Sequence, residues 1–336
     1  MSPDPLQLAY ENKSILITGA LGYVGSALIQ RLSGYDCQIF MASRHGGIGD
    51  WSGKSTKARL ESVAGDVSSR IFWQSALETS GADIVFHFAA QNSVYAAAKN
   101  PESDFAANVL PIINLVEAVF TGDKKIDVLY SGTATQAGMT QELPVDPGSM
   151  DSPLTVYDLH KLIAEQYLEL YARNDVLRCV TLRLANVYGP GVAVGSPDRG
   201  ILNKVIAAAL NDQPVSIYGD GEFIRDYIFI DDVIEAFVHA GANMDRVNGH
   251  HFFLGCGEGH RVNDAFTLAA TQAAAARGLK VNISHVPWPD ELSQIERRNF
   301  VADIRKLSDA TGWHPGVDLR EGIKRTIAAF VESGEA

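Results

Sequence analysis

The chain has 336 residues, 46% of them apolar, and a formal net charge of −12. An acidic chain without a basic stripe is expected to bind neither nucleic acid nor an anionic membrane surface. No apolar run reaches the roughly 20 residues of a membrane span, and the first residues lack the pattern of a signal peptide. Three scattered cysteines suit reduced thiols rather than disulfides or a zinc site, so we expect a cytoplasmic protein without bound metal.

Apolar strands and helical patterns alternate through the first half of the chain. Because such alternation requires right-handed crossovers, it predicts a parallel sheet covered on both faces, which is a doubly wound Rossmann fold. The predicted strands are residues 14–18, 37–42, 59–63, 83–89, 126–131 and 178–185, and the predicted helices are 24–32, 68–79, 101–120 and 155–173.

The alternation becomes irregular beyond about residue 186, which predicts a smaller mixed α/β lobe that binds substrate. We therefore divide the chain into a dinucleotide-binding domain, 1–186, and a substrate lobe, 187–336, and expect residues 228–258 to rejoin the main sheet. In this half we expect short strands near 215–218 and 251–254, and helices near 199–211, 262–276 and 319–331.

The predicted helix 101–120 is apolar on more than one face. A helix of this kind needs burial on two sides, which favours its own sheet on one side and the partner subunit of a homodimer on the other. Burial under the C-terminal lobe is the alternative. Pro111 lies inside the pattern and should kink the helix.

Three glycines, Gly19, Gly22 and Gly25, follow the first predicted strand at intervals of three residues. Glycine permits a tight turn, a close approach of backbone N–H groups to phosphate, and close packing of helix on strand. The N-terminus of the following helix would then hold the pyrophosphate of a dinucleotide. A plain glycine turn is the alternative, and the ordered α/β context disfavours it.

The end of the second predicted strand bears on the choice of nicotinamide cofactor. An acidic residue there would bind the adenosine ribose and favour NAD, whereas this chain has Ser43 and Arg44. Both suit a 2′-phosphate, so we expect NADP(H) to be preferred, with NAD(H) possible if Arg44 only stacks on adenine. Asp66, after the third strand, could lie near the adenine amino group or simply form a turn.

Tyr157 and Lys161 lie one helical turn apart and share a helix face. A free phenol has a pKa of about 10, and an adjacent ammonium should lower it toward the working range of a general acid or base. A hydroxyl at a strand end should orient the substrate oxygen, and Ser131 and Thr133 follow the fifth strand. These residues predict a hydride-transfer enzyme.

Nearly the whole chain resembles an extended short-chain dehydrogenase/reductase of the kind that modifies nucleotide sugars. The resemblance rests on the glycine turn, His-Phe-Ala-Ala-Gln at 87–91, Asn108, the Ser/Thr strand end and the Tyr157/Lys161 pair. It continues through 183–191 (Arg-Leu-Ala-Asn-Val-Tyr-Gly-Pro-Gly) and 225–233 (Arg-Asp-Tyr-Ile-Phe-Ile-Asp-Asp-Val).

The resemblance implies a role for each of these motifs. Thr133, Tyr157 and Lys161 would be catalytic, and Lys161 would also bond the nicotinamide ribose. The implied cofactor site comprises Gly19, Gly22, Tyr23, Val24, Gly25, Ser43, Arg44, Asp66, Val67, Phe88, Ala89, Ala90, Gln91, Asn108, Ser131, Tyr157 and Lys161. The implied nucleotide-sugar site comprises Gln91, Thr133, Asn186, Tyr218, Arg225 and Arg298, with Asn186 and Arg225 at the phosphates.

Two substrate-site assignments have alternatives. Arg298 is preferred over its neighbour Arg297 as a second phosphate clamp, although the two adjacent arginines could simply be solvated. Tyr218 could stack on the nucleotide base or pack within its own lobe.

The 4,6-dehydratases of this family carry an Asp-Glu pair after the strand-end Ser or Thr, and this chain has Ala134-Thr135-Gln136 there. The sequence therefore lacks the carboxylates that a dehydratase uses.

Two enzymatic interpretations remain. A 4-ketoreductase of nucleotide-diphosphate 4-keto-6-deoxy sugars is favoured by Ser43-Arg44 and by similarities at 135–138, 198–200 and 301–313. A UDP-hexose 4-epimerase that holds NAD⁺ is the alternative. A third possibility is a catalytically inactive relative that binds a dinucleotide as a sensor. The presence of Thr133, Tyr157 and Lys161 disfavours it.

Overall fold

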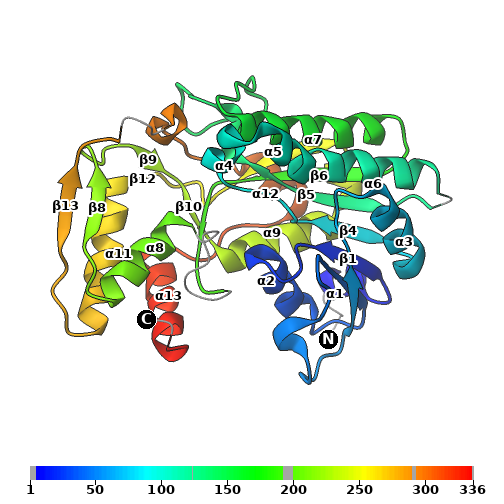
Figure 1. Cartoon of the computed structure of the whole chain (residues 1–336), viewed down its shortest axis with the longest axis horizontal. Coiled ribbons are helices and arrows are strands. Elements are labelled where there is room, and N and C mark those ends of the chain that lie inside the picture. The colour runs from blue at the N-terminus through cyan, green and yellow to red at the C-terminus, as the bar shows by residue number, and fades with distance from the viewer. Residues whose placement is uncertain (1–4, 123, 192–199, 290–292, 335–336) are drawn as a thin grey trace.

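The computed structural model describes residues 5–122, 124–191, 200–289 and 293–334, and a seven-stranded parallel sheet forms its centre. The sheet follows the order β11–β6–β5–β4–β1–β2–β3, so the direction of strand addition reverses between β1 and β4. The predicted doubly wound fold is confirmed (Figure 1). Its strands are β1 (Ser14–Thr18), β2 (Gln38–Ser43), β3 (Arg59–Ala64), β4 (Ile84–His87), β5 (Asp127–Thr133), β6 (Arg178–Leu184) and β11 (His250–Leu254).

Helices cover both faces of this sheet, and each covered face has its own apolar core. One face is covered by α1 (Pro5–Tyr10), α2 (Tyr23–Leu32) and α9 (Ile230–Ala242). The other is covered by α3 (Arg70–Ser80), α6 (Leu110–Phe120) and α7 (Val156–Arg173). The carboxyl ends of all seven strands therefore meet at one edge, where this fold class places its ligands.

The segment predicted as one helix, 101–120, forms two helices, α5 (Pro101–Asn108) and α6. Pro111 lies in the first turn of α6, where its missing N–H deprives the helix of no hydrogen bond. The proline therefore starts a new helix instead of kinking an old one. Within the described residues, 101–120 is the one stretch long and apolar enough to cross a membrane by composition alone, yet Ile112, Leu115 and Val116 are buried in the core.

The smaller lobe is built from three helices and short strand pairs (Figure 1). Its helices are α8 (Ile201–Leu210), α11 (Val262–Ala276) and α13 (Leu319–Glu332). Its paired strands are β8 (Val215–Tyr218) with β13 (Ile283–Val286), β9 (Ile224–Arg225) with β12 (His260–Arg261), and β7 (Asn186–Tyr188) with β10 (Tyr227–Phe229). The other elements are α4 (Val94–Lys99), α10 (Met244–Val247), α12 (Arg305–Thr311) and the 3₁₀ turns η1 (Gly49–Trp51), η2 (Ala134–Ala137) and η3 (Gln294–Arg297).

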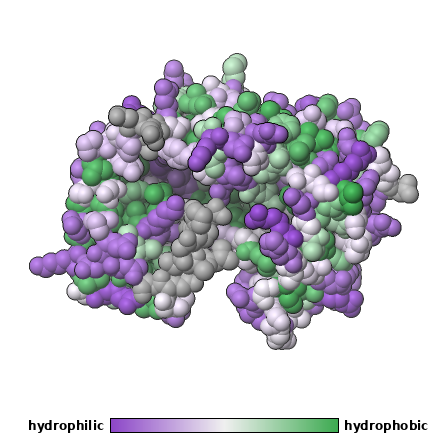
Figure 2. Space-filling view, in the orientation of Figure 1, coloured by the Kyte–Doolittle hydropathy of each residue, from purple (hydrophilic) through white to green (hydrophobic). Residues whose placement is uncertain are grey.

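The chain crosses between the lobes more than once. After β10 it returns to the larger domain as α9 and β11, both within the segment 228–258. The sequence-based boundary at 186–187 falls inside β7, which pairs with β10. Figure 2 shows that this face of the molecule is hollowed between the two lobes, with hydrophilic residues around the hollow.

Candidate active site

The glycine turn joins β1 to α2 at the edge where the strand order reverses. A Cβ on Gly19 would lie 2.8 Å from the Ala89 nitrogen, and one on Gly25 would lie 2.2 Å from the Gly19 oxygen. Gly19 also has a φ of +65°. Gly22 is the N-cap of α2 and makes no side-chain hydrogen bond, so no capping side chain covers the N-terminus of this helix. The cradle therefore fits a dinucleotide pyrophosphate.

The neighbouring strand ends place polar groups beside this turn. Ser43 ends β2 and donates to the Gly46 carbonyl (3.1 Å), whereas the exposed Arg44 has no hydrogen bond or ion pair with any described residue. Asp66 follows β3, and its carboxylate accepts a hydrogen bond from the Ser68 N–H (2.8 Å). This bond forms the turn that was the alternative to an adenine contact for Asp66. Arg44 is thus free to meet an anionic group near the turn.

The segment after β4 packs against the glycine turn and against α5. The Ala89 N–H donates to the Thr18 hydroxyl (3.3 Å), and Asn108 donates to the Gln91 carbonyl (3.0 Å). The Gln91 side chain itself donates to the buried Asp104 (2.5 Å). Of the residues predicted here, Phe88 and Ala90 belong to the same segment, and Ser131 on β5 donates to the His87 carbonyl (3.3 Å).

Tyr157 and Lys161 lie in the first turns of α7, which begins where the Thr155 hydroxyl accepts from the Asp158 N–H (3.1 Å). Lys161 is 2% exposed, and its Nζ lies 4.2 Å from the centroid of the Tyr130 ring. Burial lowers the pKa of Lys161 to about 7, against the opposing charges of Glu165 and Asp104. The lysine is therefore held inside the protein, beside the strand end that carries Thr133.

The pKa of Tyr157 differs from the sequence-based expectation. Burial raises it above the ordinary value, and the carboxylates of Asp158 and Asp104 raise it further. Only the hydrogen bond with Thr133 acts in the lowering direction. The expected lowering by Lys161 is thus wrong for the protein without ligands, because burial and two nearby carboxylates dominate.

Thr133 ends β5 and caps the 3₁₀ turn η2. Its N–H donates to the Gln136 side chain (2.8 Å), and its hydroxyl lies 2.9 Å from the Thr135 hydroxyl. Thr135 in turn donates to the Asp158 carboxylate (2.5 Å). The Tyr157 phenol, two threonine hydroxyls and a buried carboxylate therefore form one continuous chain of hydrogen bonds.

The two predicted phosphate-binding arginines are placed differently. Arg225 is buried, and its guanidinium donates to the backbone carbonyls of Ile224, Glu296 and Arg298. Burial and the charge of Arg298 lower the pKa of Arg225 to about 10. In this structure Arg225 braces β9 against the segment 296–298.

Arg298 has unused hydrogen-bonding capacity. Its guanidinium donates one bond to the Ile295 carbonyl (3.0 Å), and its Nε is buried without a partner in the part of the chain that the structure describes. Two other buried atoms within its electrostatic reach, Asp158 Oδ2 and the Tyr227 hydroxyl, also have no hydrogen-bond partner among the described residues. Buried polar groups without partners are costly, so these three atoms have hydrogen-bonding capacity that a polar ligand would satisfy. Asn186, in β7, pairs with Tyr227 beside it.

The predicted nucleotide-base contact, Tyr218, is the last residue of β8 in the smaller lobe and lies within electrostatic reach of Tyr95 on α4. Tyr218 is 42% exposed and its ring lies 5.7 Å from that of Trp288. The Arg297 guanidinium lies 5.4 Å from the Trp288 ring, so this arginine stacks on an aromatic side chain while Arg298 points inward. The ring of Tyr218 already has a partner in its own lobe, and its exposed area remains open to a second ring.

Comparison with known proteins decides the family. Residues 15–255 match the NAD dependent epimerase/dehydratase family. The chain belongs to this family. The resemblance seen in the sequence is confirmed, and this epimerase/dehydratase-family protein is an NAD(P)-dependent enzyme acting on nucleotide sugars.

Individual relatives of this family member cover nearly its full length. The UDP-glucose 4-epimerase of Mycolicibacterium smegmatis is 29% identical over 331 residues, which is 94% of this chain and 97% of that one. The UDP-glucose 4-epimerase of Thermotoga maritima, solved with UDP-glucose, has a TM-score of 0.82 at 27% identity and 95% and 99% coverage. That of Thermus thermophilus, solved with NAD, has a TM-score of 0.78 at 25% identity and 94% and 98% coverage.

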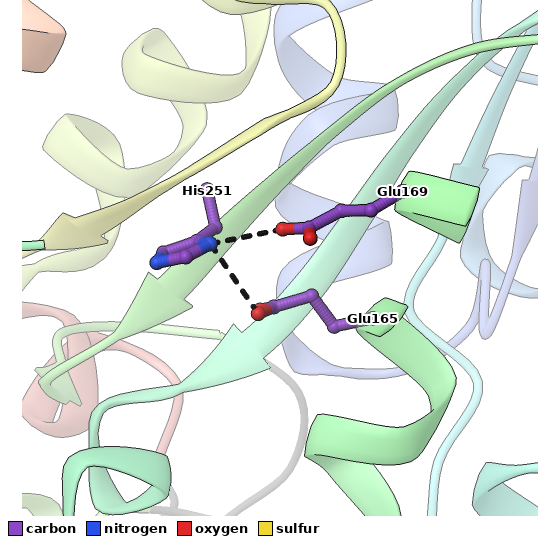
Figure 3. Close-up of side chains that lie close together, drawn as sticks. All are labelled: Glu165, Glu169 and His251. Atoms are coloured by element: carbon purple, nitrogen blue, oxygen red, sulfur yellow. Dashed lines mark hydrogen bonds and ion pairs between the residues drawn. The ribbon is translucent and has the colours of Figure 1, made fainter. Parts of the chain in front are cut away.

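Behind the site of this family member lies a buried cluster of charges that holds α7 in place. Arg183, on β6, pairs with Glu165 (2.5 Å) and with Asp151 (2.6 Å), and Glu165 also accepts from Gln136 (3.1 Å). Figure 3 shows His251 pointing toward Glu165 and Glu169, with Nδ1 at 3.5 and 2.9 Å. Glu165, Glu169 and His251 are residue types that bind metal ions. Here, however, Glu165 is paired with Arg183, and Glu169 is paired with His251 itself.

Sequence reasoning missed several polar residues of this site. Asp158 and His160 stand between Tyr157 and Lys161 in the motif, and both are buried. His160 Nδ1 lies 2.7 Å from Asp104, which also binds Gln91 and Asn108. Charged residues at two inner positions of an amphipathic helix were the available signal, since such positions are normally apolar. Asp198 and Arg199, part of the ketoreductase resemblance, lie outside the described residues.

Proposed function

We propose that this protein interconverts the C4 epimers of a UDP-hexose with a bound nicotinamide cofactor. The observation that carries the proposal is the hydrogen-bonded Thr133–Tyr157 pair beside Lys161, at the strand edge where the glycine turn lies. Relatives at 29% and 27% identity that are named UDP-glucose 4-epimerases support the choice of substrate. The absence of a carboxylate at positions 134–136 disfavours dehydration.

In this proposal each side chain has a distinct role. Tyr157 accepts the proton of the sugar hydroxyl and later returns it, while Thr133 orients the same oxygen. Lys161, when protonated, supplies the positive charge that stabilises the Tyr157 phenolate. A bound nicotinamide cofactor, held at the glycine turn and by Lys161, would supply reversible hydride transfer at the sugar carbon. Arg298 and Asn186 would hold the diphosphate between the lobes.

A nucleotide-sugar 4-ketoreductase is the second candidate, and one observation favours it. Arg44 stands exposed at the end of β2, without a hydrogen bond or ion pair to any described residue, which suits the 2′-phosphate of NADP(H). A reductase exchanges its cofactor at every turnover, so NADPH would be consumed stoichiometrically.

Purified protein incubated with UDP-glucose should form UDP-galactose without net change in the amount of reduced nicotinamide. Chromatography of the nucleotide sugars and absorbance of the cofactor test this together. Net consumption of NADPH with a 4-keto-6-deoxy nucleotide sugar, and no interconversion of UDP-hexoses, would instead establish the reductase.

A further inference from the structure

Asp158 is a fully buried carboxylate in the catalytic motif for which the proposed reaction has no role. It follows Tyr157 directly, in the first turn of α7. After burial, its negative charge is the strongest of the influences that raise the pKa of Tyr157. Asp158 therefore lies close to the phenol that would meet the reacting oxygen of the sugar.

The two oxygens of Asp158 are used differently. Oδ1 accepts a hydrogen bond from the Thr135 hydroxyl (2.5 Å), and that hydroxyl lies 2.9 Å from the Thr133 hydroxyl. Oδ2 is also buried, but it has no hydrogen-bond partner among the described residues. A buried carboxylate oxygen without a donor is costly, so Oδ2 suits a ligand that brings a donor.

The charge of Asp158 is balanced by one cation. Burial raises the pKa of Asp158, whereas bonds from Thr135 and Thr155 and the charge of Arg298 act in the opposite direction. Arg298 is the one cation among these groups. In the proposed function the diphosphate of the substrate binds Arg298 and neutralises it. Asp158 would then face the bound sugar without a compensating cation.

The sugar must lie beside this carboxylate. In the proposed function its reacting oxygen binds Tyr157 and its diphosphate binds Arg298. Asp158 is the chain neighbour of Tyr157, and it lies within electrostatic reach of Arg298 from the smaller lobe. Because the hexose joins these two ends of the substrate, it passes Asp158.

We propose that Asp158 is a specificity-determining residue that selects neutral hexoses and excludes hexuronates. This inference rests on the proposed function and narrows its substrate class. A neutral hexose offers hydroxyl groups close to C4, and one of them can donate to Oδ2. A hexuronate carries a carboxylate on C5, the neighbour of the reacting C4. This second negative charge would lie close to Asp158 and be repelled by it.

The test compares UDP-glucose with UDP-glucuronate as ligands of the NAD⁺-loaded protein. Calorimetry gives both dissociation constants in a Tyr157→Phe background, so that turnover does not convert the ligands. Like charges roughly 6–8 Å apart, at an effective dielectric constant of about 20, change a dissociation constant by about 30- to 100-fold. UDP-glucose should bind more tightly by about this factor, and Asp158→Asn should reduce the ratio of the two constants accordingly.

Matched variants separate the charge of Asp158 from other effects. Asp158→Glu keeps the charge and should keep the preference for UDP-glucose. Asp158→Ser is a second neutral variant, with the same expected ratio as Asp158→Asn. Glu296→Gln removes the carboxylate with the strongest effect on Arg298. It should change the affinity for both diphosphates and leave their ratio unchanged.

Two results would overturn the inference. Equal affinity of the Tyr157→Phe protein for UDP-glucuronate and UDP-glucose would show that the site does not exclude hexuronates, without recourse to any Asp158 variant. An unchanged ratio in folded Asp158→Asn and Asp158→Ser would assign the preference to another residue.

The proposed function and this inference can fail separately. Interconversion of UDP-hexoses by the wild type tests the function, and the ratio of the two dissociation constants tests the role of Asp158. A wild-type protein that epimerises UDP-glucose, together with an unchanged ratio in Asp158→Asn, refutes only the inference. A preference for UDP-glucose that Asp158→Asn removes, in a protein that does not epimerise, refutes only the function.

Discussion

The phenol of Tyr157 lies among groups that act on its pKa in opposite directions. Burial and the carboxylates of Asp158 and Asp104 raise the pKa, while the hydrogen bond with Thr133 lowers it. In the protein without ligands, Tyr157 is therefore protonated. Formation of the phenolate requires added positive charge, which a protonated Lys161 supplies.

Tyr157→Phe removes the proton-transferring group and keeps the ring. We expect turnover to fall at least about 100-fold, the usual contribution of a general acid or base. The dissociation constant of the cofactor, measured by fluorescence titration, should stay near the wild-type value. Tyr171→Phe on the same helix is the matched control, and substantial activity in Tyr157→Phe would exclude the assigned proton donor.

Arg44 governs the cofactor preference in our account, because it is exposed at the end of β2 and has no ion pair with a described residue. Arg44→Asp should move the ratio of NADP to NAD affinity toward NAD by about ten- to a hundredfold, the equivalent of one charge-assisted hydrogen bond. Arg59→Asp, on an exposed residue at the amino end of β3, should leave the ratio unchanged. An unchanged ratio in Arg44→Asp would mean that Arg44 does not contact the ribose phosphate.

At the scale of elements, α7 is fixed to the sheet by two of its glutamates. Glu165 pairs with Arg183 on β6, and Glu169 pairs with His251 on β11 (Figure 3). Both nitrogens of His251 are engaged, Nδ1 with Glu169 and Nε2 with the Pro147 carbonyl (both 2.9 Å). The pKa of His251 is raised, because these bonds and the charge of Glu165 outweigh the opposing effect of burial. The protonated imidazole therefore ties β11 to α7 and to residue 147.

A raised pKa in the folded state makes the contribution of His251 depend on pH. The extra stability is complete below about pH 6.5, the unfolded value, and is lost as the pH rises through the higher folded pKa. We expect His251→Gln to lower the free energy of unfolding by about 2 kcal/mol below about pH 6.5. Above the pKa of His251 in the folded protein, the loss should be smaller. Urea unfolding across this pH range measures the difference.

The neighbouring His250 provides the matched control, because it is exposed and has no ion pair with a described residue. His250→Gln should leave the pH profile of stability unchanged. A His251→Gln profile parallel to that of the wild type at all pH values would contradict the role given to the protonated imidazole.

The strands of the main sheet could be predicted because each has a strong local signal, whereas the helices α1, α4 and α9 were not predicted. Apolar residues between polar ends predict β1, and the glycines after it mark the turn into α2. The apolar pattern of 101–120 runs through Val109 and so predicts one helix, and only the position of Pro111 in a first turn separates α5 from α6. Short strands such as β9 and β12 have two residues each and no periodicity to detect.

The site was predictable for residues with a motif and not for those defined by contacts. Tyr157, Lys161 and Thr133 follow from spacing and strand ends. The pairing of Thr135 with Asp158 depends on how η2 meets α7, and the bracing role of Arg225 depends on backbone carbonyls that no sequence pattern reveals. The direction of the Tyr157 pKa likewise depends on carboxylates brought from α5 and α7 by the fold.

At the scale of the whole molecule, α6 and α7 present apolar side chains outward. Phe120 is 67% exposed, Leu170 45% and Leu159 44%. The other apolar residues of α6 are buried or half-buried, so we propose that these three exposed side chains form the homodimer interface expected from the sequence. We predict that wild-type protein sediments as a dimer and that Leu170→Arg with Phe120→Arg sediments as a monomer.

Leu8→Arg, on the exposed α1 at the opposite face of the sheet, should leave the dimer intact. Analytical ultracentrifugation over a range of concentrations distinguishes these cases. Wild-type protein that sediments as a monomer at all concentrations would contradict the proposed interface.

The two lobes meet where Thr133, Tyr157 and Arg298 lie, and our central claim is that a nucleotide sugar reacts there at its C4 carbon. The most direct measurement is chromatographic analysis of UDP-glucose after incubation with the purified protein and NAD⁺. We predict that UDP-galactose appears until both hexoses are at equilibrium, with wild-type protein and not with Tyr157→Phe. Recovery of UDP-glucose alone, with cofactor bound and the wild-type protein folded, would contradict the account.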